Sequence, residues 1–114
     1  MGNAGNGPPF DLDKALERGN LSSAWFAATE AGATHLDQFL LITILMGEEG
    51  SPRYEAAARK FLARFLREVK PTLEQVKTVS EALYVIGDEE AFSPDRGNAA
   101  KGMTDLARQL RERR

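Results

Sequence analysis

Four cations, Arg53, Lys60, Arg64 and Arg67, are the residues whose type and spacing best suit a chemical role. On a helix these positions lie on nearly the same side, so they form a narrow row of positive charge, the basic row. Only Glu68 stands at i+4 from one of them, Arg64, and it does so in the less favourable order. We predict that the basic row is the binding surface of the chain. Three interpretations are open: a solvated helix face, a docking surface for an acidic partner or the chain's own acidic half, and phosphate contacts with nucleic acid.

Side chains that suit catalysis or metal binding are few. His35 is the single histidine and has no converging partner in sequence, and the chain contains no cysteine. The acidic clusters at 48–49 and 88–90 lack the alternating ligand spacing of a calcium loop. No phosphate-binding loop, nucleophile motif or cofactor fingerprint occurs. The sequence therefore predicts a protein that is not an enzyme, with no catalytic residue, no metal and no cofactor.

Charge is unevenly distributed along the 114 residues. The net charge is −2, but residues 1–50 carry seven acidic and two basic side chains, while residues 91–114 carry three acidic and six basic ones. Such polarity favours association within the chain or between two copies. Nucleic-acid binding would need a larger positive excess. Neither of the two segments that could form a helix-turn-helix motif, residues 12–31 and 71–90, presents Arg or Lys where the second helix would meet phosphates. Nucleic acid is therefore a possible partner but not the favoured one.

Gly, Pro and capping residues mark predicted helix starts and ends, and they divide the chain into helices with short connections. Gly19 and Gly32 end two predicted helices, Ser51 with Pro52 opens a helix, and Thr72 with Gln75 forms a capping box. A further capping box pairs Thr34 with Asp37. The predicted helices span about 11–18, 21–31, 34–46, 51–69, 73–86 and 98–112, with a loop at 88–97.

Residues 39–46 form the most informative segment because, as a helix, they are apolar on every side. Such a helix must be surrounded by the rest of the chain or by a second copy. The β-branched residues at 42–44 leave a buried strand possible, but no second strand candidate exists. We expect the core to contain Phe39, Leu40, Ile44, Phe61 and Phe65.

These observations predict an all-α fold, an irregular bundle of five to six antiparallel helices built from αα-hairpins. Residues 1–10 are expected to be a disordered leader and residues 11–112 a single helical domain. No apolar run is long enough to span a bilayer, and the N-terminus does not resemble a signal peptide. We therefore expect a cytoplasmic protein without a membrane partner.

Several short segments resemble small uncharacterised all-helical proteins of high-GC bacteria. They are ALERGNL at 15–21, RFLRE at 64–68, LEQV at 73–76 and Ala82-Leu83. The resemblance covers about residues 11–86. It implies a helical fold, and it assigns no activity and no functional residue.

The favoured hypothesis is a small helical protein–protein interaction or accessory module that self-associates, as a dimer. The apolar segment 39–46 and the separated charges support it. One alternative is a nucleic-acid-associated accessory protein that uses the basic row. Another is a small-molecule binder with a pocket between helices, for example near Trp25.

Overall fold

The computed structural model describes residues 35–114, which form four α-helices and no strand. This confirms the all-helical prediction, and residues 39–46 are helical. The helices predicted at about 11–18 and 21–31, the leader and Trp25 lie outside the described residues, and the predicted total of five to six helices depends on them. None of the four described helices is long and apolar enough to cross a membrane. The helices are α3 (Leu36–Glu48), α4 (Tyr54–Glu68), α5 (Leu73–Gly87) and α6 (Ser93–Glu112).

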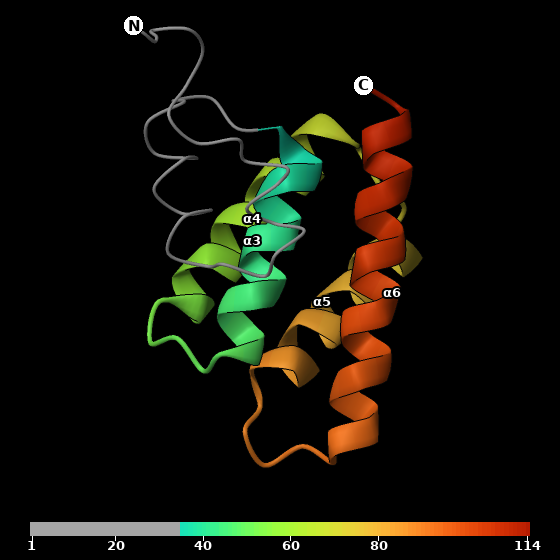
Figure 1. The fold of residues 1–114 in the computed structure, drawn as a ribbon. Helices are drawn as coiled ribbons and strands as arrows, with labels where there is room; N and C mark the ends of the chain where they lie inside the picture. Colours follow the sequence, from blue (N-terminus) through green and yellow to red (C-terminus); the bar gives the residue numbers. More distant parts are fainter. Residues whose placement is uncertain (1–34) are drawn as a thin grey trace, which may run out of the picture.

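The apolar helix α3 lies at the centre of the described bundle. It contacts α4, α5 and α6, whereas α4 and α6 do not contact each other and lie on opposite sides of α3 (Figure 1). Consecutive helices run in opposite directions, so the predicted hairpins α3–α4 and α5–α6 are present. The most extensive contact, however, joins α3 to α6, which are distant in sequence. The C-terminal ends of α3 and α5, and the loops that follow these two helices, therefore lie at the same end of the bundle (Figure 1).

Each helix contributes an apolar stripe to one core. Of the five predicted core residues, Leu40, Ile44, Phe61 and Phe65 are at most 4% exposed. Phe39 is only partly buried, because its ring lies at the edge of the core under the guanidinium group of Arg64. The rings of Phe61 and Phe65 stack with their centroids 5.7 Å apart. The other buried apolar residues are Leu36, Ile42, Met46, Tyr54, Ala57, Val79, Leu83, Ile86, Ala100, Met103, Ala107 and Leu110.

The predicted start of α3 at a Thr34–Asp37 capping box is wrong. His35 is the extended N-cap residue, and its backbone N–H donates to the Oε1 atom of Gln38 at 3.4 Å. Asp37 instead turns inward, where it is 3% exposed. The predicted stop at Gly47 is also wrong, since α3 continues to Glu48. Gly47 lies inside the helix, and its lack of a side chain leaves room for the ring of Tyr54.

The start of α4 also differs from the prediction, since the helix begins at Tyr54 and not at Ser51-Pro52. The Oγ atom of Ser51 accepts the Arg53 N–H at 3.2 Å, and its carbonyl accepts the Tyr54 N–H at 3.1 Å. Ser51 therefore organises a turn just before the helix. At the other end, Lys70 adopts φ 55°, a left-handed conformation that is typical after a helix C-cap, and Pro71 follows it.

The predicted capping box of α5 is confirmed. The Gln75 N–H donates to Thr72 Oγ1 at 3.1 Å, and the Thr72 N–H donates to Gln75 Oε1 at 2.8 Å. The predicted start of α6 at Asn98 is wrong by about one and a half turns. The helix begins at Ser93 because Phe92 is an extended N-cap and Pro94 fits the first turn, where no N–H is needed. Before it, the Ala91 N–H bonds the Asp88 carbonyl at 3.0 Å in a single turn.

Candidate functional site

A surface groove of about 600 Å³ lies between α4 and α5 and extends over the loop that joins α5 to α6. We call it the α4–α5 groove. Its base is formed by Tyr54 and Leu83, which are 8% and 5% exposed, and Ala58 and Leu62 are partly buried beside it. Tyr84 stands at its edge with 73% of its surface exposed. The residues that line it are Tyr54, Glu55, Ala58, Arg59, Leu62, Ser80, Leu83, Tyr84, Gly87, Asp88, Glu89 and Glu90.

Tyr54, at the base of the groove, joins three helices. Its hydroxyl donates a hydrogen bond to the Leu83 carbonyl oxygen of α5. Its ring lies so close to Gly47 and Gly87 that a Cβ atom on Gly47 would come within 2.8 Å of Tyr54 Cε1, and one on Gly87 within 2.7 Å of Cδ2. The two glycines therefore create the space that the ring occupies. Burial raises the pKa of Tyr54 to about 12, so this hydroxyl stays protonated near neutral pH.

The end of the groove next to the α5–α6 loop is acidic. Glu55 is paired with Arg59 at 3.4 Å, but Asp88, Glu89 and Glu90 have no salt bridge to any residue within 35–114. The carboxylate of Asp88 accepts the Glu90 N–H at 3.0 Å and thereby shapes the loop. The groove is therefore an apolar channel whose mouth carries three carboxylates without a salt bridge to a described cation.

The comparisons give no family. The chain matches no family model, no curated protein and no solved structure. The resemblance to helical proteins of high-GC bacteria accordingly stays a prediction, and the site is interpreted from its own residues.

The basic row lies on α4 and in the turn before it, away from the groove lining. Arg53, Lys60 and Arg67 are exposed, as expected. Arg64 differs, because its Nε atom donates to Glu68 Oε2 at 2.7 Å and its guanidinium group lies 5.8 Å from the centre of the Phe39 ring. This hydrogen bond lowers the pKa of Glu68. The pairing divides the row, and whether the row binds a partner stays a prediction.

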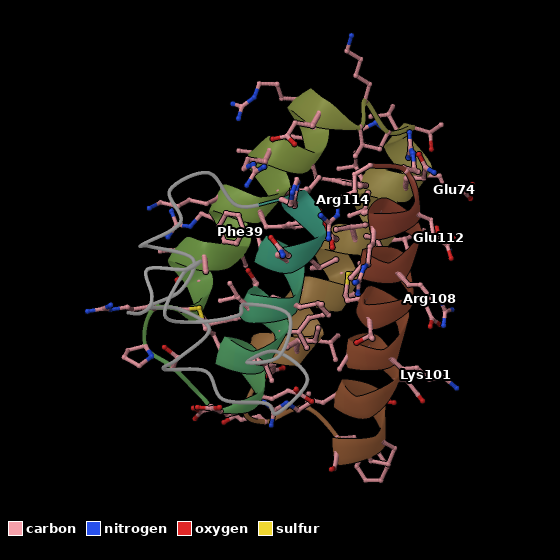
Figure 2. All side chains as sticks on the ribbon, turned by 45° about the horizontal axis from the view of Figure 1, so that its top comes forward. Phe39, Glu74, Lys101, Arg108, Glu112 and Arg114 are labelled. Atoms are coloured by element: carbon pink, nitrogen blue, oxygen red, sulfur yellow. The ribbon has the colours of Figure 1, made fainter. Side chains whose placement is uncertain are left out.

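A second, smaller cavity of about 250 Å³ lies where α6 ends beside the start of α3. Asp37 accepts two bonds from Arg114 there, Nε to Oδ1 at 3.0 Å and Nη2 to Oδ2 at 3.3 Å. Figure 2 shows Arg114 beside the first turn of α3, whereas Lys101 and Arg108 point away from the bundle. The uneven charge predicted association of the acidic first half with the basic C-terminal segment, within the chain or between two copies, but it did not identify this pair, whose members are 77 residues apart.

The buried polar side chains of residues 35–114 have hydrogen-bond partners. Within residues 35–114, no three or more His, Asp or Glu side chains converge to hold a metal ion. Tyr54 and Asp37, which are buried, both have hydrogen-bond partners inside the fold. The groove residues Leu62, Ser80 and Tyr84 were not predicted as a site. Of these three residues, only Tyr84 carries a signal in the sequence, because it is an aromatic residue outside the apolar face of α5.

Proposed function

We propose that this protein is a small interaction module that binds a helical segment of another protein in the α4–α5 groove. The exposure of Tyr84 beside an apolar channel of about 600 Å³ carries the proposal. Tyrosine is enriched among the residues that dominate binding energy at protein interfaces. A groove between two helices with apolar walls is also the geometry that receives the apolar face of an amphipathic helix.

The shape of the groove favours a peptide over a small molecule. Small-molecule sites bury most of the surface of their ligand. Here Glu55, Arg59 and Tyr84 line the groove but are themselves exposed, so the groove is open along one side. An amphipathic helix needs cover on one face only, which matches this opening.

The apolar character of residues 39–46, from which the sequence suggested self-association, does not require a second copy of the chain. The apolar residues Leu40, Ile42 and Ile44 of α3 are at most 4% exposed within a single chain, so they need no second copy. A dimer would have to use surfaces that are exposed in one chain, such as the groove. The nucleic-acid hypothesis gains no support from the basic row, since Glu68 neutralises Arg64.

A selection from a library of displayed amphipathic helices tests the proposal. We expect enriched peptides to lose about tenfold or more in affinity when Tyr84→Ser is introduced, the loss typical of an interface hot spot. Leu73→Ser is the matched control, because Leu73 is also on α5, is 88% exposed and does not line the groove. Circular dichroism should show that both variants keep their helices.

Two results would overturn the proposal. One is the absence of any enriched peptide. The other is equal binding of the enriched peptides by the wild-type protein and by the Tyr84→Ser variant, which would place the contact outside the groove.

A further inference from the structure

We infer that the segment received by the α4–α5 groove is a basic amphipathic helix, with Lys or Arg beside its apolar stripe. The inference rests on the proposed function and names the partner chemistry of the same groove. Its starting point is the mouth of the groove, where Asp88, Glu89 and Glu90 lie without a salt bridge to any residue of the described part of the chain.

The carboxylates of the mouth lie close to the C-terminal ends of two helices, whose partial negative charge is offset by the guanidinium group of Arg96. They follow directly after α5, whose C-terminal end carries a partial negative charge, and α5 has no basic residue in its last turn. The C-terminal end of α3 lies nearby, because a Cβ atom on Gly50 would be 3.6 Å from Glu89 Oε1. That helix also lacks a basic residue in its last turn, and Glu48 and Glu49 stand at its end.

Two described cations lie near the mouth, and neither forms a salt bridge with its carboxylates. Arg59 lines the groove but pairs with Glu55 at 3.4 Å. Arg96 directs its guanidinium group to backbone carbonyl oxygens, those of Ile86 at 3.0 Å and Gly47 at 3.2 Å. An incoming positive group therefore meets carboxylates that have no salt bridge to a described cation.

A metal ion would be the other simple source of positive charge, but the geometry does not favour it. Three or more convergent carboxylate or imidazole ligands are not found anywhere in residues 35–114. Lys and Arg side chains need no such convergence, because their long stems reach separate carboxylates. The apolar groove beside the mouth supplies the remaining contact, so one amphipathic helix satisfies both features.

The test takes the strongest peptide of the selection described above and sets its terminal residues to Lys, to Gln or to Glu. We expect the Lys peptide to bind about fivefold more tightly than the Gln peptide at low salt, and the Glu peptide to bind most weakly. The difference should shrink in high salt, because exposed charges are screened. Dissociation constants are measured by fluorescence anisotropy of labelled peptides.

Two double variants assign the charge preference to its site. Glu89→Gln with Glu90→Gln should abolish the difference between the Lys and Gln peptides, while Asp88 is kept because it shapes the loop. Glu74→Gln with Glu112→Gln changes the net charge equally but lies at the other end of the bundle (Figure 2). This control should leave the difference unchanged.

Each contrary result has a distinct meaning. Equal binding of the Lys and Gln peptides would overturn the inference and leave the groove as a peptide site. A preference that survives in Glu89→Gln with Glu90→Gln would also overturn it. A dimeric mass in sedimentation that becomes monomeric in the same variant would overturn it in favour of a second copy of this chain. Failure of the initial selection would overturn the proposed function itself.

Discussion

The hydroxyl group of Tyr54 on α4 donates a hydrogen bond to the backbone carbonyl oxygen of Leu83 on α5. The same ring fills the space left by the missing side chains of Gly47 and Gly87. One residue thus joins the ends of three helices and forms the base of the proposed binding groove. Its contacts lead directly to measurable consequences.

Stability should fall steeply at high pH because of Tyr54. Its pKa is about 12 in the folded protein, compared with the ordinary tyrosine value of 10.0 in the unfolded chain. Below pH 10 the Tyr54 hydroxyl is protonated in both the folded and the unfolded state, so it does not make stability depend on pH. Between pH 10 and 12 the unfolded state loses the proton first, so folding is disfavoured by about 2 kcal/mol once solvent screening is allowed for.

Urea unfolding of the wild type and Tyr54→Phe at pH 9 and pH 12 measures this effect. At pH 9 the variant should lose about 1 kcal/mol, the value of one hydrogen bond. At pH 12 the difference in unfolding free energy between the wild type and Tyr54→Phe should narrow or reverse, since phenylalanine has no proton to lose. A gap that stays constant between these pH values would show that Tyr54 does not carry the pH dependence.

Alanine at Gly47 or Gly87 should destabilise the fold by about 1–3 kcal/mol, because overpacking forces the Tyr54 ring to move. A Cβ atom at Gly47 would lie 2.5 Å from Ile86 Cγ2 and 2.8 Å from Tyr54 Cε1. Gly102→Ala is the matched control, since a Cβ there has nothing within 4 Å and the residue lies inside α6. The control should be stabilised by up to about 1 kcal/mol through helix propensity. Thermal unfolding, monitored by circular dichroism, should show a lower stability for Gly47→Ala and Gly87→Ala and a higher one for Gly102→Ala.

Arg96 should contribute about 2 kcal/mol as a cap for two helices at once. Its guanidinium group donates hydrogen bonds to the carbonyl oxygens of Gly47 and Ile86, which lie in the last turns of α3 and α5 and need hydrogen-bond donors. Arg96→Lys should recover only part of the loss seen in Arg96→Ala, because an ammonium group cannot reproduce the fork geometry. Arg108→Ala, which removes an exposed pair with Asp105, should change stability by less than about 0.5 kcal/mol. Equal losses for Arg96→Ala and Arg108→Ala in urea unfolding would contradict the capping role.

Arg114→Ala should cost about 3 kcal/mol, since it leaves the carboxylate of Asp37, 3% exposed, without its cation. The double variant with Asp37→Ala should lose less than the sum of the two single variants, as expected for interacting residues. Arg113→Ala is the control, because Arg113 lines the same cavity but has no salt bridge to a described residue. The unfolding free energies of the wild type, the two single variants and the double variant form a double-mutant cycle. Additive losses of stability in this cycle would show that the pair is not energetically coupled.

Local signals were sufficient for part of the fold. The capping box of Thr72 and Gln75 defined the start of α5, because its two hydrogen bonds join residues three positions apart. Helical spacing also identified Phe61 and Phe65 as core residues and the all-round apolar character of α3. Such features depend only on the chain within a few turns, so they can be derived from residue order.

Tertiary packing decided the remainder, including every part of the candidate site. Gly47 suggested a helix stop in sequence, but the ring of Tyr54 packs against it and the helix continues. Asp37 suggested a cap, yet Arg114 binds it across 77 residues. The groove exists because α4 and α5 leave an open channel over Leu83 and beside Tyr84, which depends on helix angle and register. These quantities are set by contacts between distant segments, and no local spacing encodes them.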